Sequence, residues 1–240
     1  MTGNPLHGAR YLLRGLRLLT QPGIRPFVIL PLLINTLLFS GLIWFLGHEF
    51  STLLDSWLPS LPDWLAWLGS LLWLLFAIAV LVVLFFGFSL LANLIGAPFN
   101  SYLSAAVERH LTGRAPVDQD PLWQSVRKSL AGEWQKIRYF ALWGIPLFLL
   151  GFVPPVNLIT PFLWLLFGAW MMSIEYLDYP LGNRGLIFSE IRRRLRQKPL
   201  LTLGFGGAVM LAGLIPVFNF LIMPTAVAGA TILRMEQFPE

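Results

Sequence analysis

The chain has 240 residues, of which 56% are hydrophobic and only 12% are charged. A soluble globular protein carries roughly 25% charged residues. This composition, together with a mean hydropathy of +0.69, predicts an integral membrane protein. It excludes a disordered chain, a collagen-like chain and a soluble nucleic-acid-binding domain. The absence of cysteine also excludes disulfides, thiolate catalysis and cysteine-ligated metals.

The charged residues lie between four uncharged stretches, if His48 is counted as neutral. These stretches are residues 26–48, 64–107, 139–174 and 199–233. The N-terminal arm holds four arginines and no acid, whereas residues 49–63 hold three acids and no base. Six basic residues lie in each of the segments 108–138 and 175–198. Because basic connectors favour the cytoplasm, we expect the N-terminus and both later connectors inside the cell and residues 49–63 outside.

Residues 1–25 are predicted to form a basic amphipathic arm. Basic side chains recur there at helical spacing, at His7, Arg10, Arg14 and Arg17, and leucines supply apolar surface. Such a helix lies in the headgroup layer. Its arginines either hold anionic lipid or contact a substrate directly.

Two long transmembrane helices are predicted next. Residues 27–47 are 21 uncharged residues, the length of one membrane crossing. Residues 64–111 form the second helix, with a break at 96–100 where the sequence reads Gly-Ala-Pro-Phe-Asn. Residues 112–138 follow as a cytoplasmic connector.

The last two apolar stretches share a repeat that predicts two helical hairpins, 139–177 and 199–234, separated by a basic helix at 184–198. Each is interrupted by Gly-x-x-Pro-x-x-Asn, and these motifs end at Asn157 and Asn219. Arms of about 12–14 residues span about 18–21 Å, whereas the hydrocarbon core is about 30 Å thick. We therefore expect hairpins that penetrate part-way from the cytoplasmic side, with complete crossings as the alternative.

The two asparagines are expected at the hairpin turns. A turn at membrane depth must be buried in protein or line a wet cavity, because lipid cannot satisfy its backbone groups. Asn157 and Asn219 then either cap their own turns or contribute to a polar route.

The sequence predicts no enzyme, metal or cofactor. It lacks phosphate-loop, zinc-protease and serine-hydrolase motifs, and its three histidines are isolated. Glu175 and Asp178 are three residues apart and share a helical face, as the carboxylates of a membrane hydrolase could, but we expect them to cap or neutralise the arginine-rich segment that follows. The uncharged membrane stretches argue against a proton relay.

The most informative polar segment precedes the first predicted crossing. Gly23, Ile24 and Arg25 form a turn at a helix start, where free backbone amides and a guanidinium suit an oxyanion. Positive-inside flanking of the helix is an equally simple interpretation. Glu108 and Arg109, at the end of the second long helix, form either an ion-pair network or a gate.

Given these features, the chain resembles the CysZ-type sulfate permease family over nearly its whole length. The resemblance rests on the basic arm, the run from Gln21 to Leu32, the break at 96–100 and the paired hairpins. The family's motif reads Gly-Leu-Arg, commonly with a second arginine, and its backbone and arginine bind sulfate. Here Gly23 and Arg25 match, Ile24 replaces the leucine and Pro26 replaces the second arginine.

The resemblance implies uptake of sulfate across the bacterial inner membrane into the cytoplasm, for sulfur assimilation and cysteine biosynthesis. It implies a homo-oligomeric, multi-pass channel or permease that does not hydrolyse ATP, with sulfite and related oxyanions left open as substrates. Gly23, Ile24 and Arg25 would bind sulfate, while Glu108, Arg109, Asn157 and Asn219 would belong to the pore. Membrane lipids are the other expected partner. The alternative function is a membrane-shaping or assembly protein that transports nothing.

Overall fold

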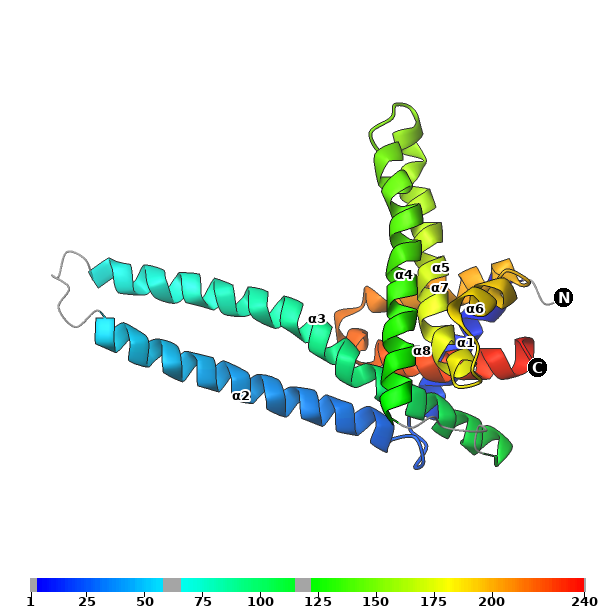
Figure 1. Ribbon diagram of the computed structural model, residues 1–240, viewed down its shortest axis with the longest axis horizontal. Coiled ribbons are helices and arrows are strands. Elements are labelled where there is room, and N and C mark those ends of the chain that lie inside the picture. The colour runs from blue at the N-terminus through cyan, green and yellow to red at the C-terminus, as the bar shows by residue number, and fades with distance from the viewer. Residues whose placement is uncertain (1–3, 58–65, 115–121, 240) are drawn as a thin grey trace. The chain divides into compact units, whose positions relative to one another are not determined.

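The computed structural model describes residues 4–57, 66–114 and 122–239, where helices joined by turns are present and strands are absent (Figure 1). The predicted all-α class is therefore confirmed for this part of the chain. The sequence predicts one membrane domain over residues 1–240, and within it the contacts form two compact units. One consists of residues 1–28 and 98–240, and the other of residues 29–97.

The unit of residues 29–97 is built from parts of α2 (Pro26–Trp57) and α3 (Ala66–Thr112). The ring of Phe50 on α2 stacks on Phe76 of α3 at 3.8 Å between centroids and meets Trp73 edge-on at 4.8 Å. Pro26–Phe50 is the one helical segment of the described chain that is long and apolar enough to cross a membrane. The first predicted crossing thus lies within a helix that continues to Trp57, past the expected end at residue 47.

Helix α3 does not break where the sequence predicted a break, because its backbone stays helical through residues 96–100. A proline inside a helix removes one hydrogen bond, and membrane helices tolerate this when neighbouring groups satisfy the freed carbonyl. The division between the two compact units nevertheless falls at this place, between Ala97 and Pro98.

The larger unit gathers the C-terminal part of α3 and the remaining helices around one apolar core. These remaining helices are α1 (Pro5–Leu18), α4 (Leu122–Leu150), the short 3₁₀ helix η2 (Val156–Leu158), α5 (Thr160–Gly182), α6 (Phe188–Leu195), α7 (Pro199–Gly213) and α8 (Pro216–Gln237). Both α1 and α5 pack against α7 and α8. The fully buried side chains at the centre include Leu103, Leu177, Phe205 and Leu233.

Helix α1 is a packing element as well as a basic arm. Asn4 caps it, since its Oδ1 accepts from the amide of Leu6 at 2.9 Å. The four predicted basic side chains are exposed. The opposite face approaches α7 and α8 through glycines: a Cβ on Gly8 would lie 2.1 Å from the carbonyl oxygen of Leu201, and one on Gly15 would lie 2.3 Å from that of Thr225.

Two hairpins are present in the larger unit. In the first, α4 ends at Leu150 and α5 begins at Thr160, and Asn157 lies exposed in η2 between them. Helix α4 starts at Leu122, so much of the predicted connector 112–138 is helical. In the second hairpin α8 already begins at Pro216, which suits the first position of a helix. Asn219 is therefore inside α8 and not at the turn, contrary to the prediction.

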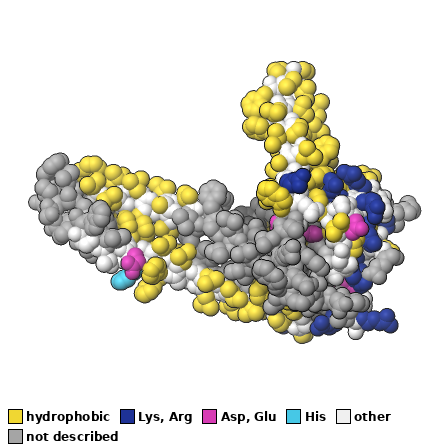
Figure 2. Space-filling view, in the orientation of Figure 1, with side chains coloured by type: hydrophobic (Ala, Val, Ile, Leu, Met, Phe, Trp, Pro, Cys, Tyr) yellow, Lys and Arg dark blue, Asp and Glu magenta, His cyan; other side chains and the backbone are white. Residues whose placement is uncertain are grey.

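The free end of the α4–α5 hairpin is covered by apolar side chains, with lysine and arginine near its base (Figure 2). The exposed apolar residues there include Leu142, Ile145, Phe148, Phe152, Phe162 and Leu166. An apolar surface of this extent is typical of a segment that meets lipid or another protein.

Candidate functional site

The turn between α1 and α2 holds the three residues predicted to bind an anion. Ile24 is completely buried and anchors the turn in the core, while Gly23 and Arg25 are exposed. The hydrophobic residue thus fixes the turn from inside, and its two neighbours face outward.

Two of the three backbone amides that we expected to be free are engaged. The N–H groups of Ile24 and Arg25 both donate to the carbonyl of Gln21, each at 3.0 Å. The turn satisfies these donors itself, because an unpaired amide beside a buried residue is costly. Of these three amides, that of Gly23 alone has no hydrogen-bond partner among the described residues.

Arg25 is held against its own turn. Its Nε donates to the carbonyl oxygen of Thr20. The two Nη groups make no hydrogen bond or ion pair with the described part of the chain. The turn therefore fixes the guanidinium of Arg25 through its Nε and leaves its two Nη groups available to a ligand.

Gly23 lines a pocket of about 260 Å³ together with the start of α2 and the end of α3. The other lining residues are Phe27, Ala106, Arg109 and His110. An adjoining pocket of about 220 Å³ is lined by Phe27, Tyr102, Ala105, Ala106 and Arg109. The structure therefore brings Gly23 and Arg109 to one pocket, although the sequence analysis assigned them to separate groups.

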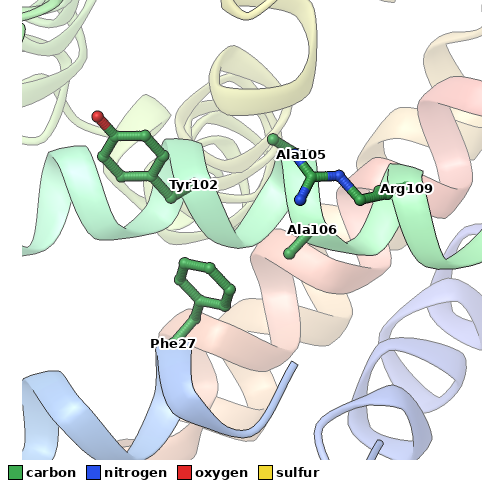
Figure 3. Close-up of a pocket in the computed structure, with 5 residues that line it drawn as sticks. All are labelled: Phe27, Tyr102, Ala105, Ala106 and Arg109. Atoms are coloured by element: carbon green, nitrogen blue, oxygen red, sulfur yellow. The ribbon is translucent and has the colours of Figure 1, made fainter. Parts of the chain in front are cut away.

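The pocket presents one guanidinium against apolar walls. Figure 3 shows the guanidinium of Arg109 turned back along α3 toward Ala105, while the ring of Phe27 approaches the same helix. Arg109 is exposed and forms no ion pair with a described residue. An arginine fork suits the oxygens of an oxyanion. Since one water occupies about 30 Å³ of liquid, this pocket has room for a small hydrated anion.

Glu108 points into the core, away from this pocket. It is 4% exposed, and its two carboxylate oxygens accept from Nη2 of Arg184 and Nη2 of Arg234. Adjacent helical residues point about 100° apart, so Glu108 and Arg109 serve different surroundings. Glu108 forms an ion-pair network with Arg234 of α8 and with Arg184, which follows α5, and Arg109 is not part of it.

A second buried network surrounds Lys136 on α4. Its Nζ lies 2.8 Å from Oε1 of Glu133, 2.8 Å from Oδ2 of Asp178 and 3.0 Å from Oε2 of Glu175. Burial alone would lower the pKa of Lys136, but the charges of Asp178, Glu175 and Glu133 outweigh it and raise that pKa above its usual value. Glu175 and Asp178 thus neutralise a lysine of α4 and not the arginine-rich segment, which corrects the prediction.

Within the larger unit, Arg192 links the arginine-rich helix α6 to Tyr139 of α4, and it also contacts Phe188 of α6 itself. The guanidinium of Arg192 lies 4.6 Å from the ring centroid of Tyr139 and 5.1 Å from that of Phe188. Such cation–π contacts hold a charged helix against an apolar surface. Lys198, just after α6, donates to the carbonyl of Gln237 at 2.7 Å.

Sequence reasoning missed Arg184, Arg234 and Lys136 as members of these networks. Glu108 is separated from its two arginines by 76 and 126 residues, so no local spacing could pair them. The one available signal was the position of Arg234, which directly follows the uncharged stretch 199–233. Among the residues that the structure describes, no group of three or more His, Cys, Asp and Glu could hold a metal.

Comparisons with known proteins identify the family. The family model described as "Sulfate transporter CysZ/Etoposide-induced protein 2.4" matches residues 11–224. A protein named sulfate transporter CysZ from Pseudomonas fluorescens (strain Pf0-1) is 47% identical over 238 residues, covering 97% of this chain and 94% of the relative.

Two further relatives carry the same name. One, from Pseudomonas aeruginosa (strain LESB58), is 45% identical over 235 residues and covers 97% of this chain and 96% of the relative. Another, from Pseudomonas fluorescens (strain Pf-5), is 49% identical over 235 residues, with 97% and 94% covered. The matched range contains the α1–α2 turn, the end of α3 and the α4–α5 hairpin. The chain therefore belongs to the sulfate transporter CysZ/etoposide-induced protein 2.4 family.

Proposed function

We propose that this chain transports sulfate across the bacterial inner membrane into the cytoplasm, where it supplies sulfur assimilation and cysteine biosynthesis. The observation that carries the proposal is that relatives named sulfate transporter align with 97% of the chain. The family is one of transporters and not of enzymes. The sequence contains no phosphate-binding loop, which favours a channel or permease that works without ATP hydrolysis.

The chain crosses the membrane more than once, with its N-terminus in the cytoplasm. The apolar segment Pro26–Phe50 supports one crossing, and the apolar part of α3 supplies the return. The basic residues of the arm and of the two later connectors support a cytoplasmic location for these segments. The exposed apolar end of the α4–α5 hairpin supports its insertion into lipid from the same side.

Sulfate is collected at the α1–α2 turn by Gly23, Ile24 and Arg25. The open Nη groups of Arg25 and the amide of Gly23 supply donors, and buried Ile24 positions the turn. The route continues past Arg109 and the Glu108 network, and the segments of Asn157 and Asn219 contribute polar groups deeper in the membrane. The transporting form is a homo-oligomer that also contacts membrane lipids.

A membrane-shaping or assembly role is the second candidate. The observation that favours it is the long apolar hairpin, combined with the exposed basic face of α1. Wedge-like hairpins and interfacial helices bind bilayers without forming a conduit. Such a protein would give no sulfate flux above that of protein-free vesicles.

The site is tested by sulfate binding and by uptake of radiolabelled sulfate into proteoliposomes, for the wild type and Arg25→Ala. Loss of the Arg25 guanidinium is expected to weaken binding by about tenfold, because it removes a charge-assisted contact. Arg25→Lys serves as the matched control, since it keeps the charge without the planar fork. Unchanged affinity and flux in Arg25→Ala would remove the α1–α2 turn from the proposed site.

A further inference from the structure

The α1–α2 turn by itself offers few groups for an anion with two charges. The amides of Ile24 and Arg25 are engaged with Gln21, and Pro26 has neither an N–H nor a charge. Arg25 is held by Thr20 through its Nε. This leaves one amide, that of Gly23, and one partly engaged guanidinium.

A second guanidinium faces the same turn from α3. Arg109 lines the pocket that Gly23 lines, and it lines the adjoining pocket with Tyr102. No carboxylate lines either pocket, so no lining residue neutralises Arg109. Its neighbour Glu108 is turned inward and satisfied by two other arginines.

We propose that Arg109 is the second cation of the oxyanion site and that it makes the site selective for dianions over monoanions. This inference rests on the proposed sulfate transport and names the residue that sets its charge selectivity. The Coulomb energy between a fixed cation and an anion scales with the anion's charge. Adding Arg109 therefore favours a dianion about twice as strongly as a monoanion in free energy.

The surroundings of Arg109 strengthen this effect. The pocket wall is apolar, formed by Phe27 and by the small side chains of Ala105 and Ala106 (Figure 3). Charge interactions are stronger beside such low-dielectric walls than in open water. The two alanines leave open the space into which the guanidinium extends, so the pocket depends on small residues at these positions. His110 lines the adjoining pocket, which Gly23 also lines, and adds a ring nitrogen there as a further donor.

The test compares binding of sulfate and of nitrate by the purified protein carrying Arg109→Gln, Arg109→Lys or the control Arg193→Gln. Arg193 is an exposed arginine of α6 that lines neither pocket. Arg109→Gln is expected to weaken sulfate binding about tenfold and nitrate binding about threefold, because removing one charged contact affects the dianion more. Arg109→Lys is expected to lose less, and Arg193→Gln to match the wild type.

A steric variant tests the pocket without changing its charge. Ala106→Leu fills space that both pockets share and is expected to reduce sulfate binding while the protein's thermal unfolding midpoint stays close to that of the wild type. Wild-type affinity for sulfate in Arg109→Gln, with sulfate flux intact, would overturn this inference and leave the transport proposal standing. Equal weakening of sulfate and nitrate would overturn the selectivity. Absence of sulfate flux in the wild type would instead refute the transport function.

Discussion

Replacing Glu108 by glutamine is the most informative single change in the core of the larger unit. The substitution keeps the size of the side chain but removes the charge that Arg184 and Arg234 share. The side chains of Glu108 and Arg234 are both buried, each with 6% of its surface exposed. Glu108→Gln therefore leaves a buried arginine without its counter-ion.

The expected loss can be given a magnitude. Removing one partner of a buried ion pair lowers the free energy of unfolding by about 3–5 kcal/mol. For a chain of this size, each kcal/mol shifts the unfolding midpoint by about 2–4 °C. We therefore expect Glu108→Gln to unfold at least about 6 °C below the wild type, measured by thermal unfolding in detergent at constant protein and lipid concentration.

Two further variants make the result interpretable. Glu49→Gln removes a carboxylate that is exposed and unpaired among the described residues, so its midpoint should stay within about 1 °C of the wild type. The double variant Glu108→Gln with Arg234→Met removes the unpaired buried charge and should regain part of the loss. If Glu108→Gln unfolds like Glu49→Gln, the carboxylate does not hold the two arginines and the assigned network is incorrect.

Three other predictions test separate features. Gly15→Ala should lower the free energy of unfolding by about 1–3 kcal/mol, because its Cβ would lie 2.3 Å from the carbonyl oxygen of Thr225. The control Gly41→Ala, whose Cβ would meet no atom within 4 Å, should not destabilise the protein. Equal unfolding midpoints for the two variants would refute the close crossing of α1 and α8. Arg14 donates to Glu236 and so holds the pKa of that carboxyl below its usual 4.5. The difference in unfolding midpoint between the wild type and Glu236→Gln should therefore be present above pH 4.5 and fade as the pH falls through the lowered pKa. A difference that persists at pH 2 would contradict the pairing of Arg14 with Glu236. A cysteine placed at Asn157 should resist a membrane-impermeant maleimide applied from the periplasm while one at Glu49 reacts, and labelling of both would show that the hairpin crosses completely.

The helical hairpins were predictable because their signals are local. Proline and glycine interrupt an apolar stretch at fixed positions, and a helix cannot easily continue through them. This placed Asn157 in a turn. The same signal misplaced Asn219, since a proline favours the start of a helix as readily as the end of one.

The α1–α2 turn was recognised from composition, but its hydrogen bonds were not. Gly23 and Arg25 led us to predict an anion site, whereas the hydrogen bonds from the Ile24 and Arg25 amides to Gln21 depend on the turn's conformation. The side of the turn that stays open, lined by Gly23, is set by the burial of Ile24. Burial of a single residue depends on tertiary packing, which local sequence does not encode.

The buried ion pairs could not be predicted from neighbouring residues either, because they also depend on tertiary packing. Glu108 joins Arg184, which follows α5, to Arg234 of α8, and Lys136 joins carboxylates of α5, so each network requires the folded arrangement of helices. Helix α3 illustrates the opposite case: a local rule predicted a break at Pro98, and the helix continued through it.

Uptake of radiolabelled sulfate by proteoliposomes tests most directly whether this chain conducts sulfate without ATP. Purified wild-type protein in vesicles without nucleotide should take up sulfate well above protein-free vesicles, down an imposed sulfate gradient, and excess unlabelled sulfate should compete. Uptake equal to that of protein-free vesicles, with the protein shown to be folded and inserted, would contradict the account.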